Sequence, residues 1–212
     1  MMETEAKIDK FIFELQEYGN SDGVANPYLE ESLRSNLKHY FELMMQQPGP
    51  RILIVGEAPG YDGCRITGIP FTSGAAIKNV NHPILAELRP LVELSSIESE
   101  KTLTIVWEYL LTLKFAPLFW NSFPFHPYPG GNNRDNRRPT SSEISDGVYF
   151  LKEIFSLFQA EAVFGLGRAG EDCAKQAFPE KDVQYIRHPS RGGKPAFISG
   201  MDEKVARILG KV

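Results

Sequence analysis

The hydrophobic positions of the chain alternate between helical stripes and short continuous apolar runs. Apolar residues recur at helical spacing over residues 6–18 and 27–45, and Pro-Gly-Pro at 48–50 ends the second stripe. Residues 51–56 form a continuous β-branched run, which is typical of a strand buried on both faces of a parallel sheet. Similar runs predict strands over residues 117–121, 162–167 and 183–186. Apolar residues at helical spacing predict further helices over 81–95, 102–114, 141–158, 168–178 and 200–210. We expect Ser141 or Ser142 to cap the helix that ends near Phe158, with Glu143 in its first turn.

Polar side chains follow three of these strands at the point where each strand ends. Glu57 follows the first strand, Asn121 ends the second, and His188 follows the fourth. Strands that alternate with helices predict a parallel sheet covered on both faces, and such sheets bind ligands beyond the carboxyl ends of their strands. We therefore expect the three side chains to meet at one edge, where the long loops 57–80 and 122–140 also emerge.

The composition is that of a globular protein without a second domain. The chain has 212 residues, of which 42% are hydrophobic and 24% charged, and we find no repeat or linker. We therefore predict one domain over residues 1–212, with N-terminal helices in 1–48 and a motif-bearing core in 50–195. No apolar run is long enough for a membrane span and no signal peptide is recognisable, so we expect a cytoplasmic protein without membrane contact.

The charge pattern leaves a local nucleic-acid interface open. The net charge of −4 disfavours a protein that coats nucleic acid along its whole surface. The cations nevertheless gather in two loops, which contain Arg134, Arg137 and Arg138, and Arg187, His188, Arg191 and Lys194. Taken alone, each cluster is more simply interpreted as solvated loop charges.

Metal and nucleotide-phosphate sites are not predicted. Cys64 and Cys173 are too few for a disulfide framework, a four-thiolate zinc site or an iron–sulfur cluster, and neither has a histidine neighbour in sequence. His39, His82 and His126 are scattered, so we interpret them as structural or surface residues. The Gly-Lys-Ser/Thr signature of a phosphate-binding loop is absent.

Four features carry candidate chemistry, and each has a structural alternative. Residues 56–60, Gly-Glu-Ala-Pro-Gly, offer exposed backbone N–H groups and one acid, or a plain turn. Phe71 lies on a constrained loop where it could stack on a planar base, for roughly 1–3 kcal/mol, or pack in the core. The Asn121 amide both donates and accepts, which matches a pyrimidine edge, but it could also cap the strand. His188, beside Ser190, could donate to an oxyanion on a leaving base, or be an ordinary loop histidine.

Taken together, these motifs resemble the uracil-DNA glycosylase superfamily, most closely its iron–sulfur thermophile-type branch. The resemblance covers about residues 50–195, most of the chain. The matching positions are residues 56–60, residues 68–71 with Gly74, residues 120–122, residues 136–140 with Glu143, residues 165–169, and residues 188–190.

The resemblance implies a three-layer α/β/α sandwich around a four-stranded parallel sheet, and DNA with a base flipped into a pocket as the substrate. Phe71 would stack on the base, Asn121 would read its edge, and His188 would stabilise its negative charge on departure. Glu57 would help to position the attacking water. The pocket wall would also include Gly56, Ala58, Pro59 and Gly60, and the expected DNA contacts are Ser190, Arg191, Lys194, Arg137 and Arg138.

Several positions depart from the family pattern. The four cluster cysteines of the branch are missing, so we expect no iron–sulfur cluster and no other cofactor. Ala58 stands where other branches carry a water-activating Asp. Without that Asp, either Glu57 activates the water or the bond breaks by a dissociation that the leaving group drives. Arg191 lies where many relatives place an apolar wedge, and Gly60 where some carry an aromatic that excludes thymine.

The sequence therefore predicts a monomeric, monofunctional DNA glycosylase that hydrolyses the N-glycosidic bond of uracil or another deaminated base. Two alternatives remain at this stage. One is a non-catalytic protein that binds nucleic acid or nucleobases on the same fold. The other is an N-glycosidase that acts on small nucleosides.

Overall fold

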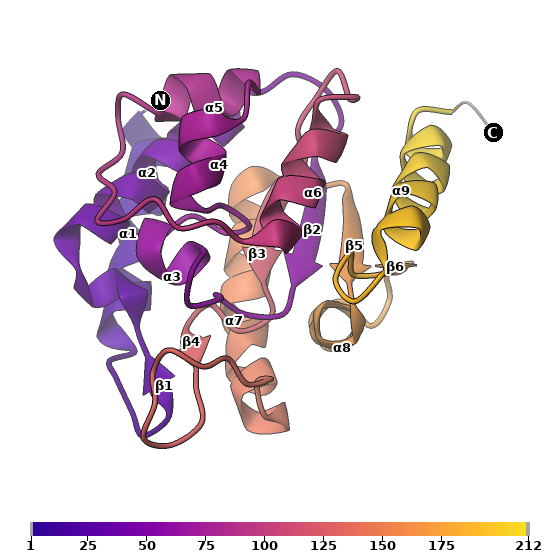
Figure 1. Ribbon diagram of the computed structural model, residues 1–212. Helices are drawn as coiled ribbons and strands as arrows, with labels where there is room; N and C mark the ends of the chain where they lie inside the picture. Colours follow the sequence, from indigo (N-terminus) through magenta and orange to yellow (C-terminus); the bar gives the residue numbers. More distant parts are fainter. Residues whose placement is uncertain (1, 211–212) are drawn as a thin grey trace.

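A four-stranded parallel sheet forms the centre of the molecule (Figure 1). The computed structural model describes residues 2–210. The strand order is β3-β2-β5-β6, and the strands are β2 (Ile52–Gly56), β3 (Leu118–Asn121), β5 (Ala162–Leu166) and β6 (Gln184–Ile186). All five residues of β2 are buried, as its continuous apolar run predicts. This sheet, flanked by helices, confirms the expected α/β class.

Adjacent residues of β3 point to opposite faces of the sheet and show what covers each face. The Trp120 ring packs edge-on against Phe11, with ring centroids 5.4 Å apart. The Phe119 ring lies on the other face, 5.0 Å from the ring of Phe71. The first face is covered by α1 (Met2–Glu17), α7 (Ser141–Phe158) and α8 (Arg168–Ala177), and the second by α4 (Gly74–Asn79), α5 (Pro83–Leu88), α6 (Lys101–Leu110) and α9 (Lys194–Ile208).

Helix α2 (Glu31–Gln46) lies beside the edge strand β3. The Tyr40 hydroxyl accepts a hydrogen bond from the backbone N–H of Phe119 at 3.1 Å. A buried edge strand needs such a partner, because an unpaired backbone donor away from water costs free energy. The predicted helix over residues 27–45 is in fact split, because Glu30 is extended between the short 3₁₀ turn Pro27–Leu29 and α2.

The segments around the glycine- and proline-rich loop are more structured than the pattern indicated. Two short helices, α3 (Cys64–Thr67) and α4, lie within residues 57–80, and only α5 forms within the predicted helix 81–95. A two-residue strand β1 (Val24–Ala25) pairs with β4 (His126–Pro127), which local periodicity did not indicate. Helix α9 begins at Lys194 rather than near residue 200, with Pro195 in its first turn, where proline is favoured.

Thr140, rather than Ser141 or Ser142, caps α7. The Thr140 hydroxyl accepts from the backbone N–H of Glu143, and the Glu143 carboxylate accepts from the N–H of Thr140. This reciprocal capping box satisfies two donors of the first turn. The expected position of Glu143 in that turn is confirmed, while the cap lies one residue earlier than predicted. Within residues 2–210, no helix combines the length and apolar character that a membrane crossing requires.

Candidate functional site

Two of the three polar strand ends predicted to converge, those of β2 and β3, lie side by side. Gly56 and Asn121 are register partners in the β2–β3 pair. Beyond the strands, the N–H of Ser122 donates to the Gly56 carbonyl at 2.9 Å, and the Ser122 hydroxyl donates to the Glu57 carbonyl at 2.5 Å. The N–H of Phe123 donates to the same carbonyl at 3.2 Å. The start of the 56–60 motif is therefore fixed against the end of β3.

Phe71 lies across the end of β2 because Gly56 has no side chain. A Cβ atom on Gly56 would collide with the far edge of the Phe71 ring. Phe71 itself has a φ of 55°, in the left-handed region that a bulky residue seldom adopts. The indole N–H of Trp107 donates to its carbonyl at 2.8 Å and holds this conformation. The ring is thus buried and fixed in place at the carboxyl end of the sheet.

Asn121 is 2% exposed, and its amide remains largely unpaired. Its Nδ2 atom lies 3.9 Å from the Cys64 Sγ atom, a weak contact. Among residues 2–210 the side chain has no other hydrogen-bond partner. Because buried polar groups are normally satisfied, an amide in this condition is typical of a site that a ligand completes.

His188 follows β6, and its proton position is set by Ser190. The backbone N–H of Ser190 donates to Nδ1 at 3.3 Å, and the Ser190 hydroxyl lies 2.8 Å from the same atom. Nδ1 is therefore an acceptor, which places the ring proton of the neutral imidazole on Nε2. Burial, with a smaller contribution from the Arg187 guanidinium, lowers the pKa of His188 to about 4. The ring is a neutral N–H donor at physiological pH.

One pocket is lined by the three residues that the sequence singled out, Phe71, Asn121 and His188. Glu57, Ala58 and Gly60 from the motif line it as well, whereas Gly56 and Pro59, which were also expected in its wall, are buried and do not line it. Four further residues that were not predicted for the site also line the pocket, namely Cys64, Glu100, Thr102 and Leu103. These four lie outside the segments that carried chemical signals, so no local pattern could have identified them.

Two cation-bearing loops meet at the mouth of this pocket. The Arg138 guanidinium lies 3.8 Å from the Glu57 carboxylate. Burial raises the pKa of Glu57, while the nearby Arg138 and Arg191 oppose that shift. The clusters that are far apart in sequence therefore both reach the 56–60 motif. Lys194 lies at the start of α9, where it pairs with Glu108 at 3.1 Å.

Arg137 differs from its neighbour Arg138, because its guanidinium is already engaged. It forms two hydrogen bonds with the Glu143 carboxylate, at 2.6 and 2.7 Å, and also donates to the carbonyls of Gly23 and Tyr128. These contacts tie the 122–140 loop to the cap of α7 and to the N-terminal region. A DNA contact by Arg137 stays a prediction.

His126 connects the same loop to the motif. Its Nδ1 atom lies 2.8 Å from the carbonyl oxygen of Pro59, and its Nε2 atom lies 3.0 Å from that of Asn133. The side chain is fully buried, and burial lowers its pKa. A second link is formed by Asn136, whose side-chain oxygen accepts from the N–H of Tyr61 at 2.9 Å. His126 is thus structural, and it supports the pocket wall.

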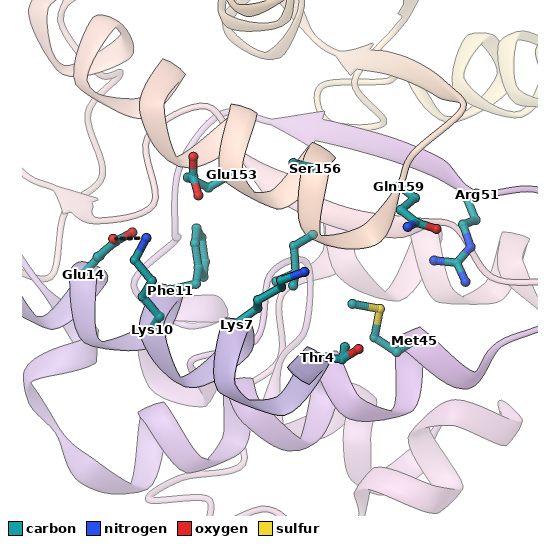
Figure 2. A pocket seen from close by; sticks show the side chains of 11 residues that line it. Thr4, Lys7, Lys10, Phe11, Glu14, Met45, Arg51, Glu153, Ser156 and Gln159 are labelled. Atoms are coloured by element: carbon teal, nitrogen blue, oxygen red, sulfur yellow. Dashed lines mark ion pairs between the residues drawn. The ribbon is translucent and has the colours of Figure 1, made fainter. Parts of the chain in front are cut away.

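A larger hollow lies between α1 and α7, away from these residues (Figure 2). Lys10 and Glu14 form an ion pair on its wall at 3.5 Å, and Arg51 precedes β2 at the opposite end of the sheet from the motif. Judged by size alone, this hollow would be the preferred binding site. Its charges, however, are surface charges of both signs, whereas the smaller pocket gathers a buried amide and a neutral imidazole. We therefore take the smaller pocket as the candidate site. Within residues 2–210, no three His, Cys, Asp or Glu side chains are grouped so as to hold a metal ion.

Comparisons with known proteins identify the family and the fold. The crystal structure of wild-type SMUG2 from Pedobacter heparinus is similar in fold, with a TM-score of 0.69 and 15% sequence identity over 96% of this chain and 98% of that chain. A search of curated proteins found no match. The family model of the uracil DNA glycosylase superfamily matches residues 45–198, which span every motif described above. The chain therefore belongs to the uracil-DNA glycosylase superfamily.

Proposed function

We propose that the protein is a monofunctional DNA glycosylase that hydrolyses the N-glycosidic bond of uracil or another deaminated base flipped out of DNA. The observation that carries the proposal is the neutral His188 ring, which lines the same pocket as the unpaired Asn121 amide and the Phe71 ring. Stacking, edge recognition and charge stabilisation are the three tasks that a flipped base requires.

The charge that develops as the base departs explains the role that we propose for His188. Cleavage leaves positive character on the sugar and negative charge on an oxygen of the base. A neutral imidazole whose Nε2 carries the proton is a hydrogen-bond donor to that oxygen. Because the pKa of His188 is about 4, the ring stabilises the anion by donating a hydrogen bond without being a cation beforehand.

Recognition of the base rests on Asn121 and Phe71. The Asn121 amide accepts from a ring N–H and donates to the adjacent carbonyl, which is the edge that deamination creates. Cytosine and adenine carry an amino group and an unprotonated ring nitrogen there. An amide held in the orientation that suits uracil would meet them donor to donor and acceptor to acceptor. The Phe71 ring stacks on the face of the base and holds its edge toward Asn121.

Water is positioned without a carboxylate at residue 58, where Ala58 lines the pocket. The Glu57 carbonyl is oriented by the Ser122 hydroxyl and the Phe123 N–H. These two donors occupy both lone pairs of the carbonyl oxygen, so we propose that the Glu57 carboxylate holds the water that attacks C1′ and that the leaving base supplies most of the driving force.

The DNA strand would lie across the mouth of the pocket. Arg138 and Arg191 both approach Glu57 there, and Ser190 and Lys194 belong to the same loop and helix start as Arg191. Cations at these positions neutralise phosphates and release counterions, so binding should weaken steeply with salt. The acidic net charge of the chain is compatible with such a local interface.

A non-catalytic binder is the second candidate, and Ala58 is the observation that favours it. The test incubates the protein with oligonucleotides that contain uracil, hypoxanthine or xanthine, and in parallel with the free nucleosides. Release of free base from oligonucleotides supports the glycosylase. Salt-sensitive binding without release supports the binder, and release from nucleosides alone supports a nucleosidase.

A further inference from the structure

Glu100 is an acid in the pocket to which the proposed chemistry gives no role. It precedes α6 as the N-cap residue, but its side chain makes no capping hydrogen bond to the helix. It lines the pocket together with Asn121 and His188. In the part of the chain that the structure describes, no side chain donates to its carboxylate or pairs with it. A half-buried carboxyl group without a partner costs free energy of desolvation. Such a group is typical of a site where a ligand supplies the missing partner.

The neighbouring glycines make room for this carboxyl group. A Cβ atom on Gly60 would lie 2.9 Å from the Glu100 Oε2 atom, and one on Gly63 would collide with the same atom. Glycine at both positions lets Glu100 reach the pocket wall beside the 56–60 motif. Asn121 approaches from the end of β3, beside Gly56, so the two side chains enter the pocket from different elements.

The groups that face Glu100 favour its neutral form. Burial, with a smaller contribution from the Asp62 carboxylate, raises the pKa of Glu100 to about 7. The Cys64 thiol also lies near it, and burial together with the Glu100 charge raises the thiol's own pKa, so Cys64 stays neutral. Across the pocket, Glu57 is a second acid and His188 is a neutral ring. None of these groups supplies a positive charge that would stabilise an ionised Glu100.

A neutral carboxyl group has one proton to donate, and the bases differ in what they offer to it. Away from its edge of N–H and carbonyl groups, uracil presents only C–H groups. A deaminated purine presents the N7 acceptor beside the O6 carbonyl on a second edge. With its first edge on Asn121, a purine can therefore accept from a protonated carboxyl group, whereas uracil leaves that group without a partner.

We propose that Glu100 is a specificity-determining residue that, in its protonated form, donates a hydrogen bond to N7 of a flipped deaminated purine and directs the pocket toward deaminated purines, with hypoxanthine as the probe. This inference rests on the proposed function, because it takes Asn121 as the reader of the first edge. Gly60 and Gly63 are needed for this hydrogen bond, since a side chain at either position would displace the Glu100 carboxyl group.

The test compares wild type with Glu100→Ala, Glu100→Gln and the exposed control Glu98→Gln. Single-turnover release of hypoxanthine and of uracil from matched oligonucleotides is measured from pH 5.5 to 9, and thermal unfolding shows that each variant is folded. We expect Glu100→Ala to lower hypoxanthine release at least tenfold more than uracil release. Glu100→Gln keeps a donor for N7, so it should retain hypoxanthine release and lose the decline that wild type shows above about pH 7. Glu98→Gln should match wild type.

Two results would overturn the inference and leave the glycosylase proposal intact. One is that Glu100→Ala slows the release of both bases equally. The other is that Glu100→Gln loses activity at high pH as wild type does. If wild type releases neither base, the glycosylase proposal fails, and binding decides the inference. Oligonucleotides with non-cleavable 2′-fluoro sugars then report base preference directly. A preference for hypoxanthine over uracil that Glu100→Ala removes supports the inference, and indifference to the base or to the variant contradicts it.

Discussion

The Nδ1 atom of His188 lies 2.8 Å from the Ser190 hydroxyl, and this contact directs the other ring nitrogen toward the pocket. Ser190→Ala removes the hydroxyl but keeps the backbone N–H that also donates to Nδ1. We therefore expect base release to fall by about tenfold rather than to vanish, because the tautomer is less firmly set. Single-turnover rates measure this, with the exposed Ser145→Ala as the control. A rate equal to wild type would show that Ser190 does not orient the ring.

The pH dependence of base release tests the protonation state of His188. Its pKa is lowered to about 4 by burial and by Arg187, so the neutral donor form is present above that pH and is lost below it. We expect no loss of rate from this residue between pH 7 and pH 5, and a decline only as the pH falls toward 4. A decline centred near pH 6.5, the ordinary value for histidine, would contradict a buried neutral ring.

Arg191 lies at the tip of the loop after His188, with a φ of 51°. If it fills the space that a flipped base leaves, Arg191→Ala should weaken cleavage in duplex DNA more than in single-stranded DNA, since only the duplex must be held open. The comparison uses the same sequence in both forms. Arg134→Ala, a substitution in the other cationic loop, serves as the control. Equal losses in both forms would assign Arg191 to phosphate contact alone.

We expect the Arg137–Glu143 pair to contribute to the stability of the fold. The two side chains are 27% and 13% exposed, so the pair is partly shielded from solvent. Glu143→Gln should lower the free energy of unfolding by about 1–3 kcal/mol at neutral pH, as measured by urea unfolding against the exposed control Glu87→Gln.

The same pair gives a signed pH prediction. The Arg137 hydrogen bonds hold the pKa of Glu143 below its ordinary value of 4.5. Its stabilisation is therefore present above pH 4.5 and is lost as the pH falls through the lowered pKa. The difference between wild type and Glu143→Gln should shrink in acid. A difference that is unchanged in acid would rule out the ion pair as its source.

The order of elements and the edge that carries the chemistry could be predicted from the sequence for a physical reason. Continuous apolar runs identify parallel strands, and parallel strands bring residues such as Asn121 and His188 to one edge whatever lies between them. That Phe71 lies in the same pocket as residues of the 56–60 motif was an expectation of the family resemblance, while its position across Gly56 was not predicted.

The remaining features depend on contacts between distant segments. Glu100 reaches the pocket only because Gly60 and Gly63, far away in sequence, leave space for it. Arg137 was expected to contact DNA, but its guanidinium binds Glu143 and the Gly23 carbonyl, the second of which lies far away in sequence. Local periodicity carries no information on contacts between distant segments. It could therefore predict neither Glu100 in the pocket nor the contacts of Arg137 within the protein.

The central claim is that the pocket of Phe71, Asn121 and His188 releases a base from DNA. The most direct measurement detects free base by mass, under single-turnover conditions, from oligonucleotides that contain uracil or hypoxanthine. Wild type should release the base and leave an abasic strand, while His188→Ala and Asn121→Ala, each folded, should be slower by about 10²–10³-fold. No free base from folded wild type, or full rates in both variants, would contradict the account.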